Sequence, residues 1–248
     1  MTVFTVVIPA RYASIRLPGK VLRDIAGKPM LQHVYERACE SAASEVVIAT
    51  DDDRIASVAE TIGATVCMTG DQHRSGTERI AEVADLLDWK DDQIVVNLQG
   101  DEPSMPPTLI NQCAELLEDV AADIATLASP LEKDEDLDNP NIVKVICNVH
   151  GHAIYFSRTA IPFAREPENR ERATAAALHH HGMYAYRCGV LRRLVQAPPS
   201  DLEICERLEQ LRALSLGMTI AVGVPPLRPG AGVDTESDLK RANQDFAP

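Results

Sequence analysis

The sequence predicts a doubly wound α/β fold, and three observations lead to it. Short apolar runs alternate with segments of helical periodicity along the first half of the chain. The apolar runs are continuous, as in parallel strands that helices cover on both faces. The chain has 248 residues, 45% of them hydrophobic, which is enough to bury one sizeable core. We therefore expect a single domain spanning residues 1–248.

The expected strands and helices follow one another in a regular order. The expected strands are residues 5–9, 45–50, 64–68, 93–99, 123–129, 142–148, 182–187 and 218–224. The expected helices lie near residues 30–38, 53–62, 76–87, 107–118 and 203–214. Pro29 suits the first turn of the first helix, and Thr235 or Ser237 could cap a last one.

Two stretches interrupt this order. Residues 131–141 are acidic and turn-rich, and residues 162–180 contain Pro, Arg, Glu and a run of Ala. Neither has the pattern of a sheet strand, so we expect an insertion or a dimer arm within about residues 131–180.

The charge and composition of the chain limit its partners. It has 24 basic and 37 acidic residues, a formal net charge of −13, and a field of this sign repels nucleic acid. No apolar run reaches the roughly 18 residues of a membrane helix, and residues 1–8 are expected to form a buried strand rather than a signal peptide. The six cysteines form no C-x-x-C pair. We therefore expect reduced thiols in a soluble, cytoplasmic protein.

The loop after the first expected strand contains three cations, Arg11, Arg16 and Lys20. Ligands of α/β proteins bind at the carboxyl ends of the strands, so these cations could cradle phosphates. A Walker A loop would require Gly at position 14 and Ser or Thr at position 21. The sequence has Ser14 and Val21 there, which excludes ordinary P-loop chemistry. The simpler alternative is a solvated basic turn.

A second signal is the acidic end of the strand at residues 93–99, which delivers Gln99, Asp101 and Glu102 to the same sheet edge. Mg²⁺ uses one or two carboxylates and is completed by waters and substrate phosphates, so Asp101 needs only one further carboxylate. Asp234 is the candidate, from a loop with two glycines and a proline. A turn or cap role for Asp234 is equally compatible with the spacing.

Two further motifs have alternative interpretations. The Ser-Gly-Thr-Glu-Arg motif that opens the third helix could present N–H groups to an anion, but an ordinary N-cap at Ser75 or Thr77 explains it as well. Three consecutive histidines occupy residues 179–181. Neighbouring side chains on a strand point to opposite faces, so the three cannot converge on one metal ion. One of them, with Tyr186 and Arg158, could instead line a pocket for an anionic acceptor.

Together these motifs resemble the 3-deoxy-manno-octulosonate cytidylyltransferase family over nearly the whole chain. The similar blocks are IPARYASIRLPGK (8–20), ATDD (49–52), SGTERIAEV (75–83), VNLQGDEP (96–103), NPNIVKV (139–145), YFSRTAIP (155–162), HGMYAYR (181–187), ERLEQLRAL (206–214) and PGAGVDTESDL (229–239). The resemblance implies a Rossmann-like nucleotide-diphospho-sugar transferase fold, with a mixed, mostly parallel sheet, helices on both faces and a dimerisation arm.

The resemblance also implies an activity and the residues that perform it. It implies transfer of CMP from CTP to 3-deoxy-D-manno-octulosonate (Kdo), with release of pyrophosphate, by a cytoplasmic homodimer that uses Mg²⁺ and serves lipopolysaccharide biosynthesis. By position, the residues implied to hold CTP are Ala10, Arg11, Arg16, Lys20, Ser75, Arg79 and Gln99. Those implied to bind Mg²⁺ are Asp101 and Asp234, which with Arg11 and Lys20 are the expected catalytic residues. Those implied to face the sugar acid are Gln99, Arg158, His181, Tyr186, Glu209 and Gln210.

Two rival functions stay open at this point. One is a cytidylyltransferase for another acid, such as 8-amino-Kdo or sialic acid, because phosphate motifs carry no information about the acceptor. The other is a catalytically idle nucleotide-binding module, which would keep the basic loop but lose the acids. Both Asp101 and Asp234 are present, which favours an enzyme.

Overall fold

The computed structural model describes residues 2–14 and 16–247. Met1 of the expected N-terminal strand segment, Ile15 of the basic loop and Pro248 lie outside the described residues. Within the described part, nine strands form one sheet in the order β11-β7-β10-β6-β1-β4-β5, with β8 beside β10 and β9 beside β8. These strands are β1 (Phe4–Pro9), β4 (Glu45–Thr50), β5 (Thr65–Met68), β6 (Ile94–Asn97), β7 (Ile124–Pro130), β8 (Lys144–Cys147), β9 (Ala153–Ser157), β10 (Leu178–Arg187) and β11 (Ile220–Gly223).

The sheet is mixed. Strands β6, β1, β4 and β5 are parallel to one another, as are β7 and β11, whereas β10 runs antiparallel to both β6 and β7. A separate short hairpin pairs β2 (Asp24–Ile25) with β3 (Lys28–Pro29). Strand β8 pairs antiparallel with both β10 and β9. The expected α/β fold, with a mixed sheet, is confirmed.

The helices enclose the sheet. They are α1 (Met30–Cys39), α2 (Asp53–Thr61), α3 (Gly76–Leu86), α4 (Pro107–Asp119), α5 (Arg170–Ala176), α6 (Cys188–Gln196), α7 (Asp201–Glu206), α8 (Gln210–Ser215) and α9 (Glu236–Asp245), with 3₁₀ turns η1 (Lys20–Leu22), η2 (Asp134–Leu137) and η3 (Pro167–Asn169). Among residues 2–14 and 16–247, no helix is long and apolar enough to cross a membrane.

The alternation of side chains along the strands divides the core into two layers. On β1, Val6 and Ile8 belong to the cluster that contains the apolar side chains of α1, α2 and α4. Val7 points the other way and belongs to the cluster formed with α3, α6 and α8. A strand buried on both faces reads as a continuous apolar run, which is why its sequence carries no alternation.

Several elements differ from the sequence-based expectation, among them the hairpin strands β2 and β3 and the helix α5, which were not predicted. The predicted helix at 203–214 is wrong, because the chain forms two short helices, α7 and α8, with Arg207 between them in the left-handed region at φ +52°. Strand β10 begins at Leu178, earlier than the predicted residue 182. The strand β9 and the helix α6 were not predicted.

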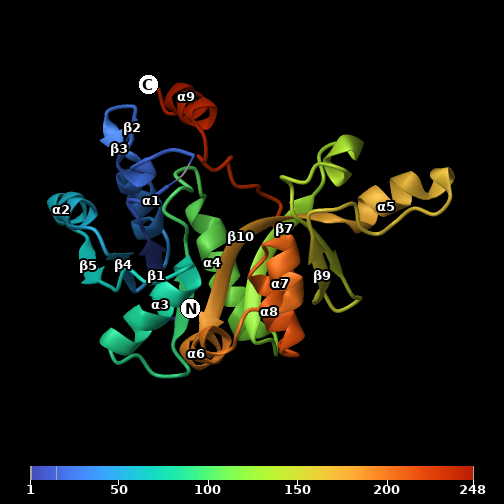
Figure 1. The fold of residues 1–248 in the computed structure, drawn as a ribbon, viewed down its shortest axis with the longest axis horizontal. Coiled ribbons are helices and arrows are strands. Elements are labelled where there is room, and N and C mark those ends of the chain that lie inside the picture. The colour runs from blue at the N-terminus through green and yellow to red at the C-terminus, as the bar shows by residue number, and fades with distance from the viewer. Residues whose placement is uncertain (1, 15, 248) are drawn as a thin grey trace.

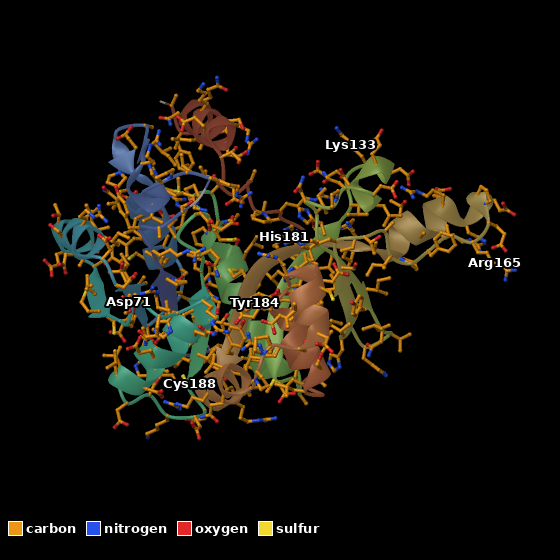
Figure 2. The ribbon with its side chains drawn as sticks, viewed as in Figure 1. Asp71, Lys133, Arg165, His181, Tyr184 and Cys188 are labelled. Atoms are coloured by element: carbon orange, nitrogen blue, oxygen red, sulfur yellow. The ribbon has the colours of Figure 1, made fainter. Side chains whose placement is uncertain are left out.

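The stretch expected to form an insertion or arm contains η2, η3, α5 and parts of β8, β9 and β10. Figure 1 shows α5 and the loop before it extending away from the sheet, and Arg165 lies at the far end of this extension in Figure 2. Arg170 ties the extension together, because its guanidinium bonds Asp134 and Asp138 at distances of 3.1 and 2.6 Å. Its use as a dimer arm stays a prediction.

Lys144 anchors the base of this extension. Its side chain is fully buried, and its Nζ donates three hydrogen bonds, to the carbonyls of Asn139 at 2.8 Å, Ile142 at 2.7 Å and Arg158 at 2.6 Å. These carbonyls belong to the loop before β8 and to the residue after β9. One ammonium thus satisfies three buried acceptors and joins two segments of the chain.

Replacing Lys144 with Met should therefore destabilise the protein more than an ordinary loss of charge. The side chain keeps its length, but three carbonyls lose their donor, which should reduce the free energy of unfolding by about 2–4 kcal/mol. Urea denaturation would measure the change, with Lys240→Met in the exposed part of α9 as the matched control. Equal stabilities of the two variants would contradict the anchoring role.

Candidate active site

The loop after β1 holds the predicted cations around a tight turn. The Gly19 N–H donates to the Tyr12 carbonyl at 3.2 Å. Gly19 has φ +64°, and a Cβ there would lie 3.1 Å from the Tyr12 ring, so glycine is required on both grounds. The Arg54 guanidinium stacks 3.3 Å from the centre of the Tyr12 ring. These contacts fix the path of the loop immediately before Lys20.

Lys20 joins the two predicted metal-binding acids. Its Nζ contacts Asp101 and donates to Asp234 Oδ1 at 2.9 Å, and the Arg16 guanidinium lies 2.9 Å from Asp234 Oδ2. Burial alone would lower the pKa of Lys20, but Asp101 and Asp234 together outweigh it and raise that pKa above its ordinary value. The structure thus brings two carboxylates from distant segments to one positive charge.

This arrangement fits a divalent cation. Two carboxylates from separate segments meet one positive charge, and carboxylate oxygens are the ligands that Mg²⁺ prefers. Among the described residues, no group of three or more His, Cys, Asp or Glu side chains forms a closed metal site. A cation held by this pair would therefore take its remaining ligands from substrate phosphates and water, as Mg²⁺ in nucleotide sites does.

Glu102 lies beside the acid pair. Burial, followed by the charges of Asp101 and Asp234, raises the pKa of Glu102 to about 8. A Cβ on Gly232 would lie 2.9 Å from Glu102 Oε1, and the Val233 N–H donates to the Asp101 carbonyl at 2.9 Å. The loop that carries Asp234 therefore packs directly against the end of β6.

The N-terminus of α3 has the N-cap that the sequence offered as the alternative role, and its hydroxyl groups also bind a carboxylate. The Ser75 hydroxyl caps the helix by accepting from the Glu78 N–H at 3.2 Å. It also donates to Glu209 Oε1 at 3.0 Å, and the Thr77 hydroxyl donates to Glu209 Oε2 at 2.9 Å. Burial raises the pKa of Glu209 despite these bonds. The cap of α3 is thus tied to the residue that precedes α8.

Arg79, also on α3, is almost completely buried. Its guanidinium lies 2.9 Å from Asp51 Oδ1 and donates to the Thr69 hydroxyl. These partners follow β4 and β5, so Arg79 joins three segments at the same edge of the sheet. Arg79 is held in place before any ligand arrives.

A first pocket opens between the basic loop, the end of β6 and the N-terminus of α3. The predicted nucleotide-binding residues that line it are Ala10, Arg11, Lys20, Ser75, Arg79 and Gln99, together with Asp101. Arg16 does not line it and instead pairs with Asp234. His73, which was not predicted, also lines this pocket and contacts Glu82 on α3. The sequence gave no indication of this role, because His73 is an isolated histidine in a turn and belongs to no motif.

A second pocket of about 600 Å³ adjoins the acids from the other side. The predicted sugar-binding residues that line it are His181, Glu209 and Gln210. Residues that line it and were not predicted for the sugar acid include Glu102, Tyr184 and Arg228. His181 and Tyr184 both lie on β10, near the middle of the molecule (Figure 2).

Three predicted sugar-binding residues do not line this pocket: Gln99, which lines the first pocket, Tyr186 and Arg158. Tyr186 is 3% exposed and lies within the core, two positions along β10 from Tyr184, which lines the pocket instead. Arg158 donates from Nε to the Glu206 carbonyl at 3.0 Å and from Nη1 to the Pro140 carbonyl at 3.2 Å. Side chains two positions apart on a strand share a face, so the strand pattern was equally compatible with Tyr184 and Tyr186 as the pocket residue.

The three histidines alternate along β10 as the strand geometry requires. The rings of His179 and His181 lie 5.0 Å apart, whereas His180 is buried with its Nε2 3.0 Å from the Thr126 hydroxyl. Burial, followed by the neighbouring histidines, lowers the pKa of His180 to about 3. The three imidazoles therefore do not converge on one point.

The lowered pKa of His180 predicts a dependence of stability on pH. An unfolded chain would protonate this imidazole near its ordinary pKa of 6.5, but the folded protein does so only near pH 3. Stability is therefore fully present above about pH 6.5 and is lost as the pH falls. Between pH 7.5 and 5.0, His180 should account for a loss of about 2 kcal/mol. Urea denaturation at the two pH values should show a smaller loss for His180→Gln.

His150→Gln provides the control for this measurement, because His150 lies in an exposed turn before β9. This variant should keep the pH dependence of the parent protein. Identical losses for His180→Gln and the parent would show that His180 does not carry the effect.

The fold and the site together define a class of protein. A basic loop, a carboxylate pair and a helix N-terminus meet at one edge of a mixed α/β sheet, as in enzymes that act on nucleoside triphosphates. The family model for cytidylyltransferases matches residues 5–220. Curated 3-deoxy-manno-octulosonate cytidylyltransferases are similar to this chain. Those from Yersinia enterocolitica serotype O:8 and Idiomarina loihiensis are each 52% identical, over 96% and 97% of both chains respectively.

A solved structure of CMP:2-keto-3-deoxy-manno-octonic acid synthetase complexed with CTP matches with a TM-score of 0.91 and 41% identity, covering 98% of both chains. A cytidylyltransferase from Leptospira borgpetersenii, 17% identical, matches in fold with a TM-score of 0.63, over 100% of this chain and 89% of that one. The chain belongs to the 3-deoxy-manno-octulosonate cytidylyltransferase family, as its sequence motifs predicted.

Proposed function

We propose that this protein transfers CMP from CTP to the anomeric hydroxyl of Kdo and releases pyrophosphate. The observation that carries the proposal is the junction of the two pockets. Asp101 lines the first pocket and its neighbour Glu102 lines the second, which supports a reaction between a nucleotide in the first pocket and an acceptor in the second. The family to which the chain belongs supports the same reaction.

The residues of the first pocket would bind and orient the triphosphate. Lys20 and Arg11 would offset charge on the phosphates, and the N–H groups at Ser75 would favour an anion at the start of α3. In-line attack by the acceptor hydroxyl needs no protein nucleophile, so catalysis depends on positioning and charge neutralisation. Gln99, two residues after β6, lines the first pocket and would contact the nucleotide.

Mg²⁺ is the cofactor that we propose for this reaction. Asp101 and Asp234 would hold it, and it would neutralise phosphate charge and lower the pKa of the attacking hydroxyl. Lys20 would then give up its place between the two carboxylates and remain close enough to pair with a phosphate oxygen. The carboxylates would thus face a cation in both states, the Lys20 ammonium before Mg²⁺ binds and Mg²⁺ itself afterwards.

We also propose a cytoplasmic homodimer that supplies an activated sugar for lipopolysaccharide. Buried reduced thiols at Cys67, Cys113 and Cys188 suit a reducing compartment. The extension formed around α5 reaches away from the sheet (Figure 1) and carries the exposed Phe163, so it could pack against a second copy of the chain.

Pyrophosphate release by the purified protein tests the reaction. CTP, Mg²⁺ and Kdo should give release, whereas sialic acid and the absence of an acceptor should give none, and EDTA should abolish it. Release with 8-amino-Kdo or sialic acid alone would change the acceptor but keep the class. No release with any acid would favour an idle nucleotide-binding module and contradict the proposal.

Replacing Asp101 with Asn tests the acid pair. The substitution keeps the size of the side chain but removes one of two charges that hold the cation, so kcat should fall at least about 100-fold while the Kd of CTP changes far less. Steady-state kinetics and calorimetric titration would separate the two effects. Asp119→Asn, at the exposed end of α4, is the matched control. Near-normal turnover in Asp101→Asn would refute the assignment.

A further inference from the structure

The second pocket presents an electrostatic difficulty for the acceptor that the proposed function requires. A sugar acid carries a carboxylate, yet most of the charged residues that line this pocket are acidic. They are Glu132, Asp136 and Glu209. A carboxylate brought close to like charges in a partly enclosed site needs a cation beside it.

Arg228 alone among the described residues that line this pocket carries a full positive charge. The three lining histidines do not supply one near neutral pH. Burial lowers the pKa of His179, and burial and the neighbouring charges lower the pKa values of His180 and His181 to about 3. Arg158 does not line the pocket, and its guanidinium already bonds two backbone carbonyls.

The guanidinium of Arg228 is positioned to bind a carboxylate. Its Nη1 lies 2.6 Å from Glu132 Oε1 and its Nη2 donates to the Pro130 carbonyl at 2.8 Å, both at the end of β7. The Glu132 side chain is 67% exposed, so this ion pair is weak and its carboxylate can be exchanged for another. A planar guanidinium offers two parallel donors that match a carboxylate.

The position of Arg228 is fixed relative to the acid pair. It lies on the same loop as Asp234, and the glycines between them pack closely against the segment that follows β6. A Cβ on Gly230 would lie 2.5 Å from the Ser104 Cβ, and Gly232 packs against Glu102. An anion bound by Arg228 would therefore lie at a set position with respect to the reacting centre.

We propose that Arg228 receives the carboxylate of the acceptor in exchange for Glu132 and so selects acidic sugars. This inference rests on the proposed transfer of CMP to a sugar acid. Arg228 takes the role that the sequence assigned to Arg158.

Kinetics with two acceptors test the inference, namely Kdo and its carboxamide, in which a neutral amide replaces the carboxylate. The parent protein should prefer the acid. Arg228→Gln should raise the KM of the acid about 10- to 100-fold, leave the KM of CTP unchanged and bring the acid and the amide to similar kcat/KM. Arg228→Lys should lie between the two, because it keeps the charge but loses the fork. Arg193→Gln, exposed on α6, is the matched control and should behave as the parent.

Glu132→Gln adds an independent readout, since it removes the competing charge but keeps an acceptor for Nη1. It should lower the KM of the acid about twofold. Equal losses of acid and amide activity in Arg228→Gln would indicate a structural role and overturn the inference, as would a loss of selectivity in Arg158→Gln alone. A parent protein that transfers CMP to no acid would instead overturn the proposed function, and with it this inference.

Discussion

The site depends on one positive charge held between two carboxylates. Asp101 and Asp234 reach the same point from segments that are far apart in the sequence, and they would repel each other if no cation lay between them. Lys20 provides that cation from the loop after β1. Three chain segments thus converge. The segments after β1 and β6 leave the same edge of the sheet, and the loop after β11 packs against the end of β6. The glycines of the 229–236 loop are required here, since side chains at those positions would push Asp234 away.

The same edge also couples the two pockets. Glu209 accepts hydrogen bonds from Ser75 and Thr77, which belong to the N-terminus of α3, and it lines the second pocket itself. The break at Arg207 makes this possible, because a continuous helix through residues 203–214 would not leave Glu209 at a helix start. Ser75 lines the first pocket, so its hydrogen bond to Glu209 joins the walls of the two pockets.

Much of the fold was predictable because continuous apolar runs indicate which segments are buried. The strand β4 was predicted at residues 45–50, as observed, and β1, β5, α2, α3 and α4 to within a few residues. Asp101 was a candidate because it follows a buried strand, whereas the spacing left Asp234 open between a metal-binding role and a turn or cap role. Only the packing of the folded chain shows that the two carboxylates meet at Lys20. Arg228 was not predictable, since only the packing of its loop against β6 and β7 brings it to the pocket. Arg158 and Tyr186 were assigned by position, but backbone carbonyls bind the one and the core encloses the other.

The overall charge of −13 makes the distribution of cations decisive. An acidic protein that binds two anionic substrates cannot rely on a general positive field, so each anion needs a cation at its own position. The cations of the β1 loop lie beside the first pocket, and Arg228 lies beside the second. Each of Lys20, Arg16 and Arg228 is already paired with a carboxylate of the protein. In the proposed reaction, substrate anions would therefore compete with protein carboxylates for these cations.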